Sequence, residues 1–429
     1  MREADTARAS TAETFSNWSG SLTATPRRRI RASTSDEVVR AVREAAADGL
    51  TLRPLGSGHS SMPVMTTDDV MLSVDDMRGV VSADPEAGLA RVLPGTGLAD
   101  LGAELAEHGL GMENLGDVDY QSIAGAIGTG THGTGVELGN LSSTLAGGTL
   151  VTGTGEEVPF GVDALGGDRT SGGADGAGNR YEGSDDDELT RAIQVSLGSL
   201  GIFTSLTLRV LPAYDLHRTN WMTHIDWVLD NLDQLMAENR HVDFYWYPRS
   251  DLAQVRILNP PGQEPNLLPP GELVKEETGP SYEILPNHRD LYFDEMEYML
   301  PLEVGPYAFR EARKRIKERH RQYVGWRVLV RTVAPDTAML SPSYRRPTMT
   351  IALLQNASLP YEPYFRDMEQ LFRAHGGRPH WGKKHTMGAA ELSELYPGWG
   401  AFGRIRERFD PDGGRMSEHL RDLLGGGTT

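Results

Sequence analysis

Cysteine is absent from the 429-residue sequence, and long apolar runs are absent as well. Without cysteine the chain can form no disulfide bond, no thiolate site for zinc or an iron–sulfur cluster, and no cysteine nucleophile. No stretch of about 18 apolar residues occurs, which argues against a membrane-spanning helix. Residues Met1–Ser10 lack the apolar core of a secretory signal peptide. We therefore expect a cytoplasmic protein with no membrane span.

Positive charge is also in short supply. The sequence has 42 basic and 60 acidic residues, which gives a formal net charge of −18. An acidic surface repels the phosphates of nucleic acids, so we expect no DNA or RNA partner. Lysine occurs only five times, and arginine supplies nearly all of the positive charge. Two explanations stay open: a high-salt cytoplasm with an acidic proteome, or an ordinary acidic protein from a GC-rich genome.

The length favours two packed domains, because single hydrophobic cores stop growing well below 429 residues. A capping box followed by an apolar stripe predicts a helix over residues 34–49. A strand is predicted directly after it, over 51–55, and two shorter strands over 70–74 and 89–93. A second helix is predicted over 98–108. This alternation indicates an α+β or α/β fold.

Glycine interrupts the pattern in the next part of the chain. Residues 114–139 lose regular periodicity, and glycine recurs too often for a stable helix or strand. We interpret this stretch as a coil that closely contacts a ligand. Residues 161–188 are rich in glycine and aspartate, which predicts an exposed insertion with the composition of disordered segments. A strand over 202–210 ends at Pro212, where a domain boundary fits.

Aromatic residues become frequent beyond that boundary. His241–Pro248 has the pattern of a sheet strand with rings on one or both faces. Residues 258–287 are interpreted as a proline-rich connection. A basic helix over 306–323 and a strand over 326–331 follow. The second half is therefore expected to combine a sheet with helices.

Two glycine-rich coils each contain one histidine, His59 and His132. Gly128–Gly133 matches the letters of the dinucleotide fingerprint, but the fingerprint needs a strand before it and a helix after it, and neither is expected here. No phosphate-binding Walker motif occurs. Paired glycine-rich coils suit a long phosphate-bearing ligand held by backbone N–H groups, for which FAD is a good candidate. Tight turns with hydrogen-bonded histidines are the alternative.

A third cluster, Arg378–His385, gathers cations, two imidazoles and an indole in a lysine-poor chain. This composition favours an anionic or polyhydroxyl ligand, and an exposed basic patch is the alternative. His380 and His385 are five residues apart with no adjacent glutamate, which misses the helical spacing of a zinc site. We therefore expect no metal.

Several motifs resemble one family in the same order along the chain. Arg53–Ser60 is similar to the flavin-attachment segment of vanillyl-alcohol-oxidase type FAD proteins. Further motifs resemble the sugar-1,4-lactone and alditol oxidases of that type, including those that act on D-arabinono- and L-gulono-1,4-lactone. These motifs are Asn114–Gly125, Thr131–Gly135, Phe293–Tyr298, Leu340–Pro342 and Arg378–His385. The resemblance covers roughly residues 16–425 apart from the insertion.

The resemblance implies an α+β fold with a two-subdomain, PCMH-type FAD-binding domain and a C-terminal α+β cap that binds substrate. The FAD domain would span 16–212, with 161–188 as its insertion, and the cap 213–385. Residues 386–429 would return to the FAD domain. The resemblance further implies that FAD is joined covalently to His59, because relatives with histidine at this position commonly have that bond.

By the same resemblance, the protein is an FAD-dependent oxidoreductase that oxidises a CH–OH group of a sugar lactone, alditol or related polyol. A hydride passes to flavin N5, and oxygen is the expected acceptor. Arg331 and Lys383 are the expected catalytic residues, and Ser122, Arg331, His380 and Lys383 are expected to bind substrate. The residues expected to bind FAD are Pro54, Gly56, Ser57, Gly58, His59, Ser60, Asp117, Ser122, Gly125, Gly128, Thr131, His132, Gly133, Ile202 and His385.

Two positions depart from the family pattern. Relatives usually have glutamate two residues before the cap-strand arginine, and this sequence has Leu329 there. A polar residue common in the 351–355 stretch is also replaced by leucine. We therefore expect the site to lack this carboxylate and to bind a polyol less well, which leaves open a less hydroxylated substrate or a non-catalytic flavin protein. Gly128 and Gly130 leave space beside the expected flavin, which favours an oxidase over a dehydrogenase with another acceptor.

Overall fold

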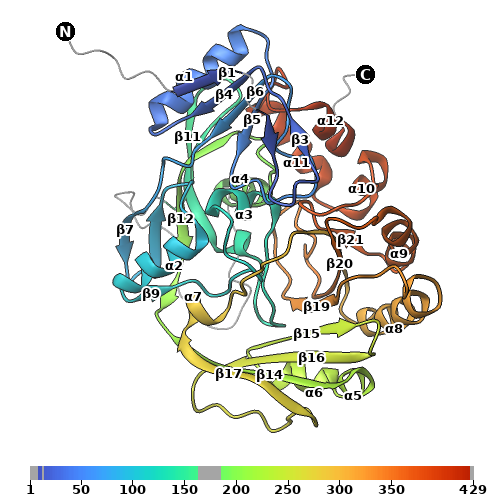
Figure 1. The fold of residues 1–429 in the computed structure, drawn as a ribbon. Helices are drawn as coiled ribbons and strands as arrows, with labels where there is room; N and C mark the ends of the chain where they lie inside the picture. The colour runs from blue at the N-terminus through green and yellow to red at the C-terminus, as the bar shows by residue number, and fades with distance from the viewer. Residues whose placement is uncertain (1–7, 12–13, 163–184, 426–429) are drawn as a thin grey trace.

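The structure of the protein, a computed structural model, describes residues 8–11, 14–162 and 185–425. Within these ranges the chain forms three larger sheets and two short strand pairs. The first two sheets come from the part of the chain before residue 213, and the third comes from the part after it (Figure 1). This arrangement agrees with the expected α+β fold.

The first part of the chain contributes a four-stranded and a five-stranded sheet, counted over the described residues. The order in the first is β1 (Arg8–Thr11), β4 (Arg28–Arg31), β6 (Val70–Ser73) and β5 (Leu52–Leu55). The order in the second is β11 (Glu157–Gly161), β10 (Leu145–Val151), β12 (Ile202–Arg209), β8 (Leu89–Val92) and β7 (Val80–Asp84). The short pairs are β2 (Phe15–Ser16) with β3 (Thr23–Ala24), and β9 (Leu110–Gly111) with β13 (Leu211–Pro212).

The third sheet is antiparallel throughout its described strands, which number eight. Their order is β17 (Glu272–Pro280), β14 (Asp215–His224), β16 (Leu252–Asn259), β15 (His241–Tyr247), β19 (Val328–Val333), β20 (Thr348–Asn356), β18 (Phe293–Pro301) and β21 (Arg378–Pro379). Its register places Leu329, Ala352 and Glu297 in one row across β19, β20 and β18. Side chains in such a row point to the same face of a sheet.

Helices are spread over both parts of the chain. In the first part they are α1 (Ser35–Ala47), α2 (Leu98–Glu107), α3 (Ile123–Thr129) and α4 (Asp185–Gln194). In the second part they are α5 (Ile225–Asp230), α6 (Leu232–Glu238), α7 (Ser281–Ile284), α8 (Gly305–Arg315) and α9 (Glu362–Ala374). The chain ends with α10 (Ala389–Leu395), α11 (Trp399–Phe409) and α12 (Glu418–Leu424). None of the helices in the described ranges combines the length and apolarity that a bilayer crossing requires.

Most of the expected elements are confirmed within one to four residues. Helix α1 begins after Thr34, whose side chain accepts a hydrogen bond from the Glu37 N–H, and Gly49 follows its end with φ +65°. This is the capping pattern that the sequence indicates. The strands expected near residues 52, 70, 89 and 202, and the helix expected at 98, are also present.

The expectation of a continuous coil over residues 114–139 is wrong for α3. Three apolar side chains of this helix are fully buried, and their packing outweighs the low helix propensity of its two glycines. The helix ends at Gly130, which has φ +73°. The glycine fingerprint at Gly128–Gly133 therefore begins at the end of a helix instead of after a strand. That context does not match a dinucleotide fingerprint.

The segment expected to be a proline-rich connection contains regular structure. The stretch 258–287 is not only a connection, because it contains β17 and α7. Strand β17 pairs with β14 along its length, but its side chains are mostly exposed and charged, so it lacks the apolar alternation that predicts strands. Of the expected insertion, residues 163–184 lie outside the described residues.

The two faces of the eight-stranded sheet have different neighbours. On one face, Phe244 and Trp246 of β15 pack edge-on against Phe309 of α8, with ring centroids 5.4 and 5.7 Å apart. On the other face, Tyr245 and Leu329 belong to a separate apolar cluster. The expected aromatic strand thus has rings on both faces. The second face is turned toward the first part of the chain, where the candidate site lies.

The C-terminal helices lie beside the first sheet (Figure 1). The Leu52 N–H donates to the Gly414 carbonyl, and the Gly153 N–H donates to the Phe409 carbonyl. The end of the described chain therefore packs on the part that precedes residue 213.

Candidate active site: two adjoining cavities

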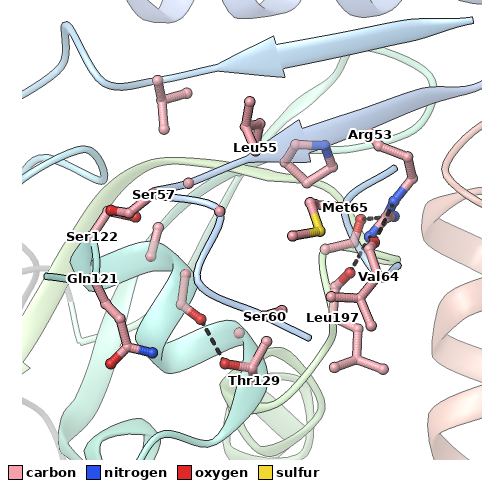
Figure 2. A pocket seen from close by; sticks show the side chains of 18 of the residues that line it. Arg53, Leu55, Ser57, Ser60, Val64, Met65, Gln121, Ser122, Thr129 and Leu197 are labelled. Carbon is pink, nitrogen blue, oxygen red and sulfur yellow. Dashed lines mark hydrogen bonds between the residues drawn. The ribbon is translucent and has the colours of Figure 1, made fainter. Parts of the chain in front are cut away.

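The first cavity is a cleft of about 820 Å³, including the part open to solvent, in the first part of the chain. Three segments line it: the loop after β5, the start of α3, and the chain that leads from α4 into β12. Figure 2 shows side chains from these segments, including Ser57, Ser122 and Leu197, around the open space. The loop after β5 and the α3 segment are two of the glycine-rich stretches that the sequence singles out.

Arg53 fixes the start of the loop. Its buried guanidinium donates hydrogen bonds to the carbonyl oxygens of Val64, Leu197, Gly198 and Arg415. Burial, with the nearby Arg415 cation, lowers the pKa of Arg53 to about 9, so it stays charged at neutral pH. One cation thereby holds together strands and loops that are far apart in sequence (Figure 2).

Glycine is required at two positions of this loop. A Cβ atom on Gly56 would lie 2.5 Å from the Ser122 hydroxyl oxygen. Gly58 has φ +69°, and a Cβ atom there would lie 3.1 Å from the Phe15 ring. Glycine at position 56 therefore lets the loop follow the start of α3 closely, and glycine at position 58 lets it turn beside Phe15 of β2.

Two polar atoms at this cavity are buried without a hydrogen-bond partner among the described residues. They are the Ser122 hydroxyl oxygen, at the N-cap of α3, and Nε2 of His59. Burying a polar group without a partner costs about 1–3 kcal/mol, so such groups indicate a ligand that supplies the partner. Gly128 also lines the cavity, and no atom lies within 4 Å of where its Cβ would stand.

The second cavity adjoins the first and shares His59 and Gln121 with it. It lies between the coil around residues 116–132 and the open face of the eight-stranded sheet. Its walls are Gly116, Asp117, Val118, Thr131, His132, Phe293, Glu295, Glu297, Leu329, Arg331, Leu354, His380 and Lys383, in addition to the two shared residues. Charged and aliphatic side chains therefore face the same space.

Two ion pairs dominate the polar part of this cavity. Lys383 Nζ donates to Glu295 Oε2. Arg331 Nη2 donates to Glu297 Oε1 over 2.6 Å, and His132 Nε2 lies 3.2 Å from the same oxygen. Arg331 Nη1 also donates to the His132 carbonyl, which ties the cap strand β19 to the coil.

The two carboxyl groups are shifted in opposite directions. Burial raises the pKa of Glu295, and the charge of Glu297 adds to this effect while Lys383 opposes it. Burial also disfavours the charge of Glu297, but Arg331 and His132 outweigh it and hold the pKa of Glu297 well below its usual range. Burial lowers the pKa of His380 as well. Paired carboxyls with separated pKa values are typical of acid–base sites.

His132, Glu297 and His380 offer ligand atoms that all lie within 4.8 Å of one another. This is a geometry in which a metal ion can be held. However, Arg331 donates to the same Glu297 oxygen and already places a positive charge there. The cation that this structure provides for Glu297 is the guanidinium group.

Most residues that the sequence indicated line one of the two cavities. In the first are Pro54, Gly56, Ser57, Gly58, His59, Ser60, Ser122, Gly125, Gly128 and Ile202. In the second are His59, Asp117, Thr131, His132, Arg331, His380 and Lys383. Asp117, expected at the flavin, accepts hydrogen bonds from Tyr245, Asn287 and Arg289 instead of lining the first cavity.

Gly133 and His385 line neither cavity. A Cβ atom on Gly133 would lie 2.2 Å from Asn114 Oδ1, so this glycine allows two parts of the coil to pack. Both ring nitrogens of His385 are buried without a partner among the described residues, and burial lowers its pKa to about 3. Its ring lies edge-on to Trp381.

The absence of the family's glutamate at position 329 does not leave the second cavity without carboxylates. Leu329 does line the second cavity, but Glu297 lies in its row two strands away, with only Ala352 between them. Arg331 reaches this carboxylate across β20. The signal that sequence reasoning missed is the pair Glu295 and Glu297, two acids whose spacing places them on one face of the strand β18.

Comparison with known proteins agrees with this arrangement. A family model described as D-arabinono-1,4-lactone oxidase matches residues 206–276 and 270–423, and an FAD binding domain model matches residues 26–161. L-gulono-1,4-lactone dehydrogenase of Mycobacterium tuberculosis is 34% identical, over 96% of this chain and 99% of the relative. L-gulonolactone oxidase of Bos taurus is 26% identical, over 96% and 98%. A cholesterol oxidase of Brevibacterium sterolicum has the same fold, with a TM-score of 0.80 at 16% identity over 97% of each chain.

The chain belongs to the D-arabinono-1,4-lactone oxidase family. As a member of this family it is an FAD-dependent oxidoreductase that acts on CH–OH groups. The first cavity fits the cofactor, because its glycines admit a ligand close to the backbone and its buried Ser122 and His59 atoms have no hydrogen-bond partner in the part of the chain that the structure describes. The FAD binding domain model covers the loop after β5 and the start of α3.

Proposed function

We propose that the protein oxidises a CH–OH group of a sugar lactone or a related polyol, with FAD in the first cavity and the substrate in the second. The observation that supports this most directly is the pair of charged couples, Lys383 with Glu295 and Arg331 with Glu297, in a cavity that shares His59 with the FAD cavity. Hydroxyl and carbonyl oxygens of a sugar are suitable partners for such groups.

Each charged residue of the second cavity has a different proposed role in the reaction. When bound, FAD supplies a hydride acceptor, which the protein lacks. We propose that Arg331 and Lys383 bind the substrate oxygen and stabilise developing negative charge. Glu295 receives the hydroxyl proton on a carboxylate oxygen, since its raised pKa makes it the better base of the two acids. Glu297 stays charged and holds Arg331 in place.

The aliphatic part of the second cavity limits the substrate. Leu329, Leu354 and Phe293 line the wall next to the acids. We propose a substrate with hydroxyl groups on one edge and C–H surface on the other, as a sugar lactone ring has. An open-chain alditol presents hydroxyl groups on every carbon and fits this wall less well, so lactones are expected to be the better substrates.

Three finer points belong to the same proposal. FAD is joined covalently to His59, which lines both cavities. Dioxygen is the acceptor, a role supported by the open space beside Gly128. The chain is divided at residue 212 into an FAD domain and a cap, residues 386–429 complete the FAD domain, and the protein works in the cytoplasm.

Anaerobic mixing of the purified, yellow protein with substrates tests the function. L-gulono- and D-arabinono-1,4-lactone are expected to bleach the flavin absorbance faster than alditols do. Readmitted air is expected to restore the colour and yield peroxide. Absorbance that stays unchanged with every lactone and alditol would refute the proposal. Rapid dye reduction with negligible peroxide would refute only the choice of dioxygen.

A further inference from the structure

An indole ring stacks on His59. The Trp18 and His59 rings have centroids 4.6 Å apart and planes that differ by 12°. Trp18 belongs to the turn between β2 and β3, more than thirty residues before the loop that it covers. In such stacking the indole contacts the face of the imidazole and does not block the nitrogen atoms at the edge of that ring.

Hydrogen bonds fasten this turn to the histidine loop. The backbone N–H of Trp18 donates to the Gly58 carbonyl over 2.8 Å, and Asn17 Nδ2 donates to the Ser60 carbonyl over 3.0 Å. The two bonds reach the residues immediately before and after His59. The indole is therefore held in register with the imidazole by its own backbone as well as by ring contact.

The other side of the turn is held by the cap strand β18. Ser21 donates to Asp294 Oδ1 over 2.7 Å, and the Phe293 ring lies edge-on to Trp18 at 5.2 Å. Trp18 also packs against the apolar cluster that includes Leu329. The indole thus has a fixed place between the histidine loop and the wall of the second cavity.

The imidazole beneath it is suited to act as a nucleophile. Burial, followed by the charge of Lys383, lowers the pKa of His59 to about 3, so the ring is neutral at physiological pH. Its Nε2 atom is buried without a hydrogen-bond partner among the described residues. A neutral imidazole with an unengaged nitrogen can form a bond to carbon once it is correctly oriented.

We propose that Trp18 is a positioning residue for covalent attachment of the flavin: its stacked indole holds the His59 imidazole in the orientation in which a ring nitrogen reacts. The inference rests on the proposed attachment at His59. In that step an imidazole nitrogen bonds to the flavin 8-methyl carbon. The imidazole N–H and one methyl C–H bond break, and their two protons and two electrons pass by way of the flavin ring to dioxygen, giving hydrogen peroxide.

Substitutions at position 18 test this inference through the bond itself instead of through turnover. The fraction of flavin that stays with the protein after acid precipitation, and flavin fluorescence in a denaturing gel, report covalent FAD. Trp18→Met fills the space without a ring face and is expected to slow attachment about tenfold or more, while total FAD bound stays unchanged. Trp18→Phe keeps a stacking ring and is expected to restore most of the covalent fraction.

Trp326→Met is the matched control. Its ring contacts Phe293 in the same apolar cluster but does not stack on His59, so attachment is expected to proceed normally. Should Trp18→Met fail to fold, Asn17→Ala removes the bond to Ser60 and is expected to slow attachment in the same direction.

The outcomes distinguish the role of Trp18 from the attachment of FAD at His59 on which it depends. If the unmodified protein releases all its flavin on acid precipitation, attachment at His59 is refuted, and the role of Trp18 falls with it. If the unmodified protein holds flavin covalently and both Trp18→Met and Asn17→Ala attach it at the normal rate, only the role of Trp18 is refuted. Equal losses in Trp18→Met and Trp326→Met would indicate general packing and would also refute it.

Discussion

Lys383 and Lys384, in the loop that follows β21, have different surroundings. Lys383 lines the second cavity and contacts Glu295. Lys384 does not line it, and its Nζ lies 3.5 Å from Asp294 Oδ1 and 4.5 Å from the centre of the Tyr361 ring. The chain therefore contains its own control for the catalytic role of a lysine at this place.

We expect Lys383→Ala to slow flavin reduction by lactone about 10²- to 10³-fold. Loss of one donor that stabilises charge in a transition state typically has an effect of this size. Lys384→Ala is expected to stay within a few-fold of the unmodified protein, because neither Lys384 nor its partner Asp294 lines the cavity. Stopped-flow reduction under anaerobic conditions measures both rates. Rates within a few-fold of the unmodified protein for both variants, with normal flavin content, would show that Lys383 has no catalytic role.

The acid beside Lys383 gives a prediction about pH. Because burial raises the pKa of Glu295, this carboxyl takes up a proton at a higher pH than an ordinary glutamate. A protonated carboxyl cannot receive the substrate proton, so the reduction rate is expected to fall as pH decreases through that raised pKa. Glu295→Gln should lower the rate about 10²- to 10⁴-fold and remove this pH dependence. A variant that keeps the same pH profile would show that another group accepts the proton.

Sequence reasoning found the cations of this site but not their partners. Lys383 can be predicted because the chain has few lysines, and Arg331 can be predicted because the cap motifs are specific to the family. The sequence shows that Leu329 departs from the family pattern, but strand order cannot be deduced from one strand, so the acids that face Arg331 are not apparent from it. The carboxylate that Arg331 contacts comes from β18, which the sheet places two strands from β19. Only the register across β20 brings Glu297 to Arg331.

At the scale of elements, the glycine-rich coil is more ordered than its composition predicts. Helix α3 owes its stability to burial of its apolar side chains, and short helices in proteins depend on such packing more than on propensity. The helix matters for the site because it places Ser122 at its N-cap beside Gly56. Local signals predicted the glycine contacts but not the helix, since burial is set by neighbours that are remote in sequence.

A buried acid joins this coil to the loop between β19 and β20. Asp336 accepts hydrogen bonds from Asn140, Ser341 and the Ala338 N–H. Burial raises its pKa to about 6. The raised value means that the folded protein binds a proton more tightly than the unfolded chain, whose aspartates have a pKa of about 3.9. Stability is therefore lost as pH rises from about 4 to 6.

Asp336→Asn tests this assignment. The loss expected from the shift is about 3 kcal/mol, at 1.36 kcal/mol for each pKa unit. The unfolding free energy of the variant, relative to the unmodified protein, should improve by about that amount between pH 4 and pH 7. Denaturant unfolding of both proteins at the two pH values measures it. A difference that does not change with pH would contradict the raised pKa.

At the scale of the whole molecule, the active site depends on contacts between parts of the chain that are far apart. Asp117, in the coil of the first part, is paired with Arg289 of the second part at 2.5 Å. Burial opposes the charge of Asp117, but Arg289 and Arg256 outweigh it and keep its pKa below the usual range. Such buried pairs are little affected by salt, whereas exposed charges are screened by it. This difference allows the contribution of the acidic surface to be measured separately.

The contribution of the net charge of −18 to stability can be measured from the dependence of Tm on salt. Like charges on a compact molecule repel one another and destabilise it, and the repulsion weakens as the screening length falls from about 10 Å at 0.1 M salt to about 3 Å at 1 M. We expect the Tm of the FAD-loaded protein to rise by about 2 °C or more between 0.05 and 0.5 M NaCl. Differential scanning calorimetry measures it, and sucrose at equal osmolality controls for solute exclusion. A Tm that is constant or falls with NaCl would show that surface ion pairs, and not repulsion, dominate the effect of charge on this fold.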